Sequence, residues 1–226
     1  MTVAAVVLAD SISAALTNAD GLPRVRRIAD AAWSGGALPI VVVTPDDDGQ
    51  VLTALAGAPV TLVEPGPAEG RTAARLQLGV DTAVELVAAT RAVLVWPTAM
   101  CWVGPETVTS LIEAHGARPD ALLEPTYGGV AGWPKLLPLA QADMLAALAR
   151  LLDDPAATLR SAAIEIAALV IELGDPGVTI DGNTARSDLP PYDGPQQPVH
   201  DHAHEWGSSV DDLAREPSLS SPSGRD

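Results

Sequence analysis

The sequence predicts an α/β fold, in which helices cover both faces of a mostly parallel, Rossmann-like sheet in a three-layer α/β/α arrangement. Two observations carry this prediction. Short apolar runs rich in valine, isoleucine and leucine recur along the chain, as is typical of strands buried on both faces of a parallel sheet. Segments with apolar residues at helical spacing separate these runs, and this alternation favours parallel pairing with right-handed crossovers.

The individual elements follow from these runs and from the turn residues that bound them. Strands are predicted over residues 3–8, 38–44, 60–64, 91–96, 121–125 and 167–173, with a short apolar piece over 135–139. Helices are predicted over residues 24–34, 50–56, 71–89, 105–115, 141–152 and 155–165. The loop after the first strand therefore lies at the carboxyl edge of the sheet, where open α/β sheets bind their ligands.

A change in composition divides the chain into two parts. Residues 1–188 are predicted to form one domain, which is long enough to bury a sizeable core. From residue 189 onward, proline, serine, aspartate and histidine replace most of the aliphatic residues. Such a segment buries too little apolar surface to offset its ordering entropy, so residues 189–226 are predicted to be a largely disordered tail.

Charge and cysteine content limit the partners and the compartment. The formal net charge of −16 predicts repulsion from nucleic acid and from anionic membrane surfaces, so neither is expected as a partner. The one basic cluster, Arg24, Arg26 and Arg27, is interpreted as a solvated helix face. The single cysteine, Cys101, excludes an internal disulfide and is expected in the wall of a pocket. With no signal-peptide pattern and no long apolar segment, the protein is expected in the cytoplasm.

The first strand and its loop resemble the start of a known enzyme family. Residues 8–20 read LADSISAALTNAD and have the length of the motif L-A-A-G-x-S-x-R-M-G-x-x-K, with which the MobA and MocA type of molybdenum cofactor nucleotidyltransferases begins. The resemblance implies a fold like that of glycosyltransferase A and of the nucleotide-diphospho-sugar transferases. It makes this segment a degenerate nucleotide loop, whose positions include Asp10, Ser11, Ser13, Ala15 and Asp20.

Four later segments resemble further motifs of the same family, in the same order. The motifs E-G-x-x-x-S-L-x-x-G, P-E-T-L-x-x-L-I and Y-x-G-x-x-G-H-P correspond to residues 69–79, 105–112 and 127–134, and the ending D-P-G-V…D-I-D-T-P corresponds to residues 175–184. The resemblance implies an acceptor-side cleft formed by Glu69, Gly70, Tyr127, Gly128, Gly129, Trp133 and Pro134.

The chain departs from the family where the family binds phosphate and metal. Asp20 stands at the position of the loop lysine, and Ala15 at that of the loop arginine. The family ends its central strand in G-D-Q-P, whose aspartate holds magnesium, whereas residues 97–100 here read PTAM. Of the acidic pair near the end of the domain, Asp181 remains and Asn183 replaces its partner.

Nucleotidyl transfer needs cations and donors around the triphosphate and carboxylates that bind Mg²⁺. The sequence therefore favours a pseudoenzyme: a degenerate nucleotidyltransferase that acts as a binding or scaffolding partner, with a protein partner or a homo-oligomer, no cofactor and no strong nucleotide binding. Two alternatives stay open. One is an active, Mg²⁺-assisted nucleotidyltransferase with non-standard residues, in which Asp181 and Asp10 are metal ligands. The other is a small-molecule-binding protein that uses the acceptor side.

Several single residues have two interpretations. Asp10, Asp20 and Asp181 can bind a cation or a partner's basic side chain. Simple turn roles are favoured for Asp10 and Asp20, with Asp10 capping the turn that follows it. His200, His202 and His204 can bind a metal ion weakly, although a solvated linker is favoured. His115 is expected to partner the dipole of its helix. Three tryptophans, Trp96, Trp102 and Trp133, are expected to fill the degenerate pocket rather than to form a docking surface or to stack on a ligand.

Overall fold

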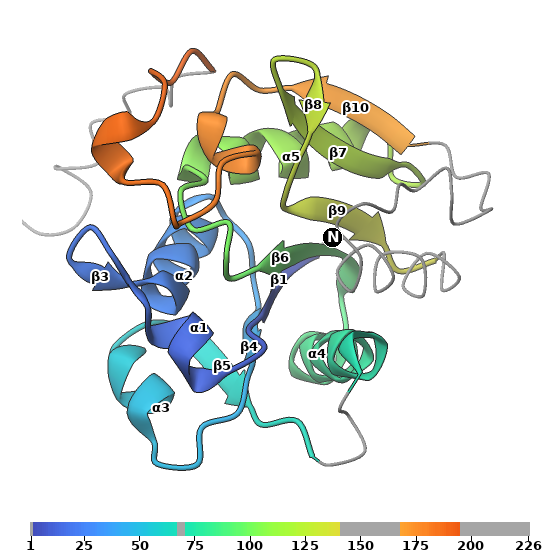
Figure 1. Ribbon diagram of the computed structural model, residues 1–226. Coiled ribbons are helices and arrows are strands. Elements are labelled where there is room, and N and C mark those ends of the chain that lie inside the picture. The colour runs from blue at the N-terminus through green and yellow to red at the C-terminus, as the bar shows by residue number, and fades with distance from the viewer. Residues whose placement is uncertain (1, 67–70, 141–167, 195–226) are drawn as a thin grey trace, which may run out of the picture. The chain divides into compact units, whose positions relative to one another are not determined.

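A mixed sheet of eight strands organises the part of the chain that this computed structural model describes, residues 2–66, 71–140 and 168–194 (Figure 1). Its order is β10-β7-β9-β6-β1-β4-β5, with β8 paired to β7. The strands are β1 (Thr2–Leu8), β4 (Ile40–Val43), β5 (Val60–Val63), β6 (Thr90–Pro97), β7 (Leu122–Tyr127), β8 (Val130–Ala131), β9 (Lys135–Pro138) and β10 (Ala168–Glu172).

The predicted parallel sheet is confirmed. Strand β1 pairs in parallel with both β4 and β6, β4 pairs in parallel with β5, and β7 pairs in parallel with β10. Residues 3–8 of β1 are all buried, because the strand lies inside the sheet and helices cover both of its faces. The apolar, β-branched run at the start of the chain is therefore the centre of the molecule's core.

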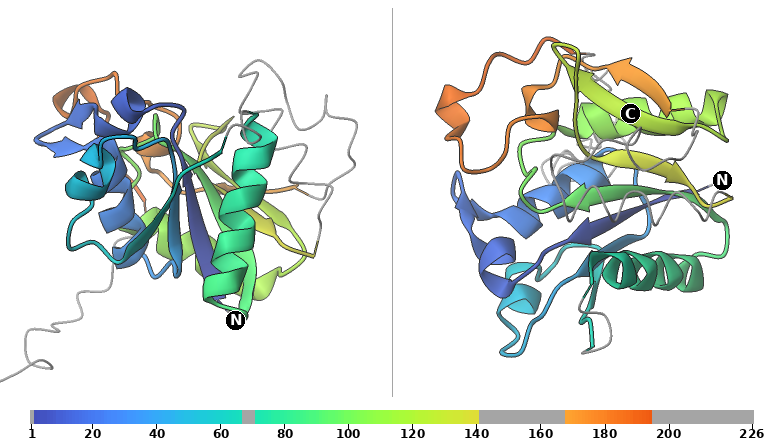
Figure 2. Two further views of the ribbon diagram at one scale, coloured as in Figure 1. Left: turned by 90° about the horizontal axis from the view of Figure 1, so that it is seen from below. Right: turned by 45° about the vertical axis from the view of Figure 1, so that its right-hand side comes forward.

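Helices lie on both faces of the sheet, as Figure 1 and Figure 2 show. Helix α4 (Thr72–Leu86) covers one face, where its buried residues pack against Ala4, Val6 and Leu8 of β1. Helices α2 (Arg24–Ser34) and α5 (Pro105–Ala117) contribute to the apolar cluster on the other face, with Ala5 and Val7. The short helices are α1 (Ile12–Leu16) and α3 (Gln50–Ala54). This arrangement confirms the predicted three layers.

Two pieces of structure are absent from the predicted elements. After β1 the chain forms α1 and then a small hairpin, β2 (Asn18–Ala19) with β3 (Leu22–Pro23). The apolar piece at 135–138 is strand β9, which runs antiparallel between β6 and β7. The turn at Gly128 and Gly129, both with positive φ, reverses the chain after β7 and leads it into β8 and then β9.

Some predictions concern residues that the structure does not describe. The helices expected at 141–152 and 155–165 lie outside the described residues, as do Glu69, Gly70 and the three histidines of the expected tail. Residues 189–194, where that tail was expected to begin, are described, and the Asp193 N–H donates to the Gly174 carbonyl at 2.9 Å. None of the helices in the described ranges is long and apolar enough to cross a membrane.

One expectation about a helix end is wrong. His115 is 1% exposed near the end of α5, and in the described part of the chain neither of its ring nitrogens has a hydrogen-bond partner. Burial lowers the pKa of this imidazole, so that it is neutral near pH 7. A neutral ring brings no charge to the helix dipole, and the carbonyls of Ala114 and His115 accept the Arg118 N–H instead.

The carboxyl edge of the sheet gathers three segments that are distant in the sequence. The loop that follows β1 leads to α1 and to the β2–β3 hairpin. Residues 98–104 follow β6, and residues 175–188 pass close to them, with the Gly182 N–H donating to the Ala99 carbonyl at 2.7 Å. The candidate site is built from these three segments.

Candidate functional site

Serine hydroxyl groups stabilise the turn that leads from β1 into α1. Ser11 is the N-cap of α1, and its Oγ accepts from the Ala14 N–H at 3.1 Å and lies 2.9 Å from the Ser13 Oγ. Ala15 is fully buried beneath them. The expectation that Asp10 caps this turn is wrong, because Ser11 has the extended backbone and the short hydroxyl side chain that an N-cap requires.

Asp10 instead points away from the turn. Its side chain is 92% exposed, and one carboxylate oxygen lies 3.7 Å from Arg75 Nη1 on α4. The same Arg75 nitrogen donates to the Asp10 carbonyl at 3.4 Å. A cation therefore stands beside the expected nucleotide loop, but it comes from α4 and not from the loop itself.

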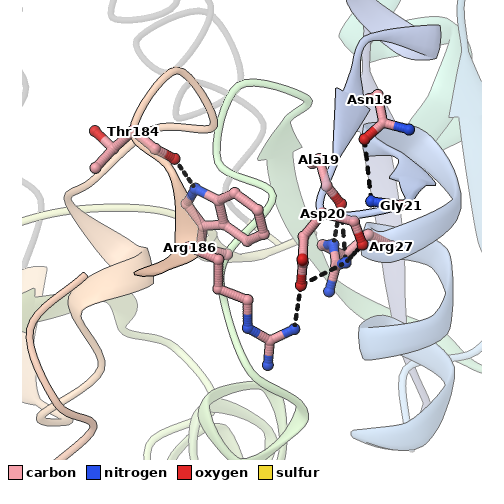
Figure 3. A network of polar contacts seen from close by, with 8 residues as sticks. Asn18, Ala19, Asp20, Gly21, Arg27, Thr184 and Arg186 are labelled. Carbon is pink, nitrogen blue, oxygen red and sulfur yellow. Dashed lines mark hydrogen bonds and ion pairs between the residues drawn. The ribbon is translucent and has the colours of Figure 1, made fainter. Parts of the chain in front are cut away.

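Asp20 lies at the tip of the β2–β3 hairpin and forms ion pairs with two arginines (Figure 3). Its backbone has a φ of 54°, in the left-handed region that aspartate tolerates better than most residues. One carboxylate oxygen lies 3.2 Å from Arg186 Nη1 and 3.7 Å from Arg27 Nη2. Arg27 also donates to the carbonyls of Ala19 and Asp20. Asp20 thus joins the hairpin, α2 and the 175–188 segment.

Trp102 lies in the same network. The Arg27 guanidinium carbon is 5.1 Å from the centre of the Trp102 ring, a cation–π distance. The indole Nε1 donates to the Thr184 carbonyl at 3.0 Å. The indole is half-buried and lies between Arg27 of α2 and the 175–188 segment. Trp96, by contrast, is fully buried and donates from Nε1 to the Met100 carbonyl, as expected of a residue that fills the pocket.

Arg24 begins α2 and is only 8% exposed, so the interpretation of the arginine cluster as a solvated face is wrong for this residue. Its Nη2 donates to Asn183 Oδ1 at 2.9 Å, and its buried Nε has no partner among the residues that the structure describes. Asn183 in turn donates from Nδ2 to Asp181 Oδ2 at 3.1 Å. Within the described residues, no carboxylate oxygen lies within ion-pair distance of Arg24, and a neutral amide is its hydrogen-bond acceptor.

Cys101 and Gly182 pack tightly against Arg24. A Cβ added to Gly182 would come within 2.6 Å of Cys101 Sγ and 2.7 Å of Arg24 Nε, so this position needs a glycine. Cys101 is 1% exposed. Burial raises the pKa of the Cys101 thiol, although Arg24 and Arg27 act in the opposite direction. The thiol is therefore a neutral wall of the site at pH 7.

The metal site that the family resemblance implies does not fit these residues. At the end of β6, the position of the expected magnesium ligand is Thr98, and residues 91–106 contain no carboxylate before Glu106. The described residues hold no group of three or more potential metal-ligating side chains. Asp181 is close by, but its carboxylate accepts two hydrogen bonds from Asn183. The buried Arg24 guanidinium lies next to this pair and would repel a divalent cation.

In the described part of the expected acceptor side, the Glu172 carboxylate holds the glycine turn in place. Glu172 on β10 accepts from the N–H groups of Gly128 and Gly129, each at 3.1 Å, and from the Thr126 hydroxyl. The hydrogen bond from Gly129 is the main cause that lowers the pKa of Glu172. Tyr127 is half-buried next to this turn. These bonds give the glycine turn a structural role.

A buried ion pair lies beside the remaining acceptor-side residues. Trp133 is half-buried and donates its N–H to the Val178 carbonyl at 2.8 Å, and Pro134 follows it as a buried residue. Lys135, the one lysine of the sequence, forms an ion pair with Glu124 and places its Nζ 5.1 Å from the centre of the Trp133 ring. The structure therefore brings Tyr127 to Pro134 together around the β7–β8 turn.

The sequence did not identify three arginines as site residues: Arg24, Arg27 and Arg186. A signal for the first was present, because Arg24 lies four residues before Ile28, on the same helix face as the buried apolar stripe. Arg27 lies one turn from Arg24 on α2. Arg186 gave no signal, because its contact with Asp20 joins positions 166 residues apart.

The comparisons with known proteins identify the fold and the family. A family model described as the MobA-like NTP transferase domain matches residues 13–167. None of the curated proteins matches the chain. A crystal structure of Rv0371C in complex with manganese, from Mycobacterium tuberculosis H37Rv, is 16% identical with a TM-score of 0.55, covering 76% of this chain and 89% of that chain.

Two further structures have the same fold. A nucleotidyl transferase from Methanothermobacter thermautotroptrophicus is 19% identical with a TM-score of 0.55, covering 76% of this chain and 87% of that chain. A 4-diphosphocytidyl-2C-methyl-D-erythritol synthase is 19% identical with a TM-score of 0.55, covering 79% of this chain and 91% of that one. At such identities the likeness concerns the fold, whereas the family match spans more than half of the sequence. The chain belongs to the family of proteins with a MobA-like NTP transferase domain.

Proposed function

We propose that this protein is a MobA-like family member that has lost nucleotidyl transfer and acts by binding. The observation that supports this most strongly is the position of Arg24. Its guanidinium lies between the Asp181–Thr184 segment and Cys101, next to the positions where the family resemblance implies a metal ion. In this proposal, the fixed positive charge of the Arg24 guanidinium replaces the exchangeable metal ion.

The expected nucleotide loop supports the same proposal. Nucleotidyl transfer depends on cations that take up the charge of the triphosphate as the bond to the leaving group breaks. Asp20 places a carboxylate at the position of the loop lysine, and that carboxylate pairs with Arg27 and Arg186. The loop therefore lacks the lysine that would take up the charge of the leaving pyrophosphate.

The alternative of an active enzyme has one observation in its favour. Arg75 lies beside the Asp10 loop and brings a cation to the place where the family's loop has its own. An arginine supplies charge but cannot be a metal ligand. The alternative that the acceptor side binds a small molecule has less support, because the glycine turn is already held by Glu172.

Calorimetric titration of the full-length protein with each of the four nucleoside triphosphates tests the proposal. Each titration is made in EDTA and again with Mn²⁺ or Mg²⁺, and a family member with the complete loop motif serves as the positive control. We expect that adding the metal ion does not strengthen binding to this protein. Micromolar binding that requires the metal ion would instead show a working nucleotidyltransferase site and would overturn the proposal.

The partner and the compartment stay predictions. A protein partner or a second copy of the chain is expected as the binding target, and the net charge of −16 argues against nucleic acid. A single free thiol that is buried suits the reducing cytoplasm. Size-exclusion chromatography with light scattering, followed by identification of co-purifying proteins, tests both forms of the partner prediction.

A further inference from the structure

A cluster of arginines is the least expected feature of so acidic a chain. Arg24, Arg27 and Arg186 come together at the carboxyl edge of the sheet, around Cys101 and Trp102. Arg24 and Arg27 are one helical turn apart on α2, and Asp20 bridges Arg27 to Arg186. Among the described residues, Asp20 pairs with two of these cations and Asp181 is linked to the third through Asn183, so three arginines stand against two carboxylates.

Arg24, the buried member of the cluster, has no charged partner among the described residues. Removing a guanidinium from water costs several kcal/mol unless an anion or a full set of acceptors compensates it. Arg24 is 8% exposed, donates from Nη2 to a neutral amide, and keeps Nε without an acceptor. Among the described residues, Arg24 therefore has a hydrogen-bond donor without an acceptor, and no anion offsets its charge.

The other two arginines hold an anion that belongs to the protein. Asp20 is half-exposed at the tip of a two-residue hairpin turn, so its carboxylate can leave Arg27 and Arg186 without disturbing the core. Ion pairs with this degree of exposure contribute little to stability, because water screens their charges. A ligand with more charge and more acceptor oxygens than a carboxylate can displace Asp20.

We propose that Arg24, Arg27 and Arg186 form a site that binds the phosphate group of a small molecule without a metal ion. Guanidinium groups present paired donors that match phosphate oxygens, and three of them suit the three terminal oxygens and the double charge of a phosphate monoester better than the two oxygens of a carboxylate. In the absence of ligand, Asp20 forms ion pairs with two of the three arginines. This inference rests on the proposed binding function and names its ligand class.

The test is calorimetric titration of the full-length protein with inorganic phosphate, pyrophosphate and acetate, all in EDTA. Asn183→Asp is the central variant, because it keeps the size of the side chain and gives Arg24 a carboxylate of the protein itself. Asp20→Asn removes the internal competitor. Arg24→Met removes the buried cation, and Arg118→Met, at an exposed arginine just after α5, is the matched control.

We expect the wild-type protein and Arg118→Met to bind phosphate equally, and more tightly than acetate. Asn183→Asp and Arg24→Met should weaken phosphate binding about tenfold or more, and Asp20→Asn should strengthen it severalfold. If Arg24→Met does not fold, Asn183→Asp still decides the outcome, because it retains every arginine.

Three results would overturn the inference. One is the absence of phosphate and pyrophosphate binding, and another is acetate binding as tight as phosphate binding. The third is weak binding that Asn183→Asp and Asp20→Asn leave unchanged, which would indicate an adventitious ion only. Failure here is distinct from failure of the proposed function, which shows itself as nucleotide binding that depends on Mn²⁺ or Mg²⁺.

Discussion

At the scale of single residues, His115 shows how burial without partners affects stability. Its ring is 1% exposed, and both nitrogens lack a hydrogen-bond partner within the described ranges. A buried polar group without a partner costs about 1–3 kcal/mol, whereas an apolar group of similar shape costs nothing comparable. We therefore expect His115→Leu to raise the free energy of unfolding at pH 7 by about 1 kcal/mol, as measured by urea denaturation.

The same residue predicts how stability depends on pH. An unfolded histidine has a pKa of about 6.5, and burial lowers the pKa of His115 in the folded protein, although Asp120 opposes this. Below about pH 6.5 the unfolded chain therefore binds a proton that the folded chain does not, so stability falls as the pH falls. Urea titrations from pH 7.5 to pH 5 should show a widening advantage of His115→Leu over the wild type. A constant difference at every pH would contradict this prediction.

Asp175 acts at the boundary between a residue and an element, because its buried carboxylate caps a helix from a distant part of the chain. It accepts from the Gly104 N–H, the Thr107 hydroxyl and the Gly177 N–H, at 2.9, 2.6 and 2.8 Å. These bonds fix the start of α5 against the 175–188 segment. We expect Asp175→Ala to lower the free energy of unfolding by about 3 kcal/mol, because three donors lose their acceptor.

Asp188→Ala is the matched control for that variant. Asp188 lies in the exposed turn Arg186–Asp188, and its carboxylate accepts a hydrogen bond from the neighbouring Ser187 hydroxyl. Its removal should change the free energy of unfolding by less than about 0.5 kcal/mol. Equal effects of the two variants in denaturation experiments would mean that the cap does not hold α5 in place.

At the scale of elements, the packing of α4 on the sheet depends on one glycine. A Cβ at Gly79 would come within 2.5 Å of Val6 Cγ1 and 3.0 Å of Val43 Cγ2. Alanine is the better helix former, but here its methyl group would push α4 away from β1 and β4. Gly79→Ala should therefore lower the free energy of unfolding by about 1–3 kcal/mol.

Gly116 of α5 is the matched control for this glycine. No atom lies within 4 Å of a Cβ built there, and its backbone is helical, so Gly116→Ala should raise the free energy of unfolding by about 0.5–1 kcal/mol. The opposite signs of the two variants, measured by thermal or urea denaturation, test the close approach of α4 to the sheet. Stabilisation by both variants would contradict it.

At the scale of the whole molecule, the sequence predicts the sheet well because burial on both faces leaves a clear pattern. The runs at residues 3–8 and 92–96 can be identified as strands because each is a continuous buried stretch, and β1 and β6 prove to be neighbours. Strand β9 could not be placed in the same way. Its direction is set by the turn at Gly128 and Gly129 and by pairing with β6 and β7, which are contacts between distant residues.

The candidate site was less predictable than the fold for the same physical reason. Asp20 was identified as an unusual residue of the loop, but its pairing with Arg186 joins the two ends of the domain. Arg24 was interpreted as exposed, because an arginine near the start of a helix usually is. Its burial depends on Gly182 and Cys101, which pack against it from other segments. Local patterns contain no information about such contacts.

A titration of Mn²⁺ into the full-length protein, followed by electron paramagnetic resonance, tests the central claim most directly. That claim is that the Arg24 guanidinium has replaced a divalent cation at the carboxyl edge of the sheet. Rv0371C, which has been crystallised with manganese, is a suitable positive control. We predict no binding at this edge below about 1 mM Mn²⁺ and no change in the Asp181→Asn variant. A micromolar Mn²⁺ site that Asp181→Asn abolishes would contradict the claim.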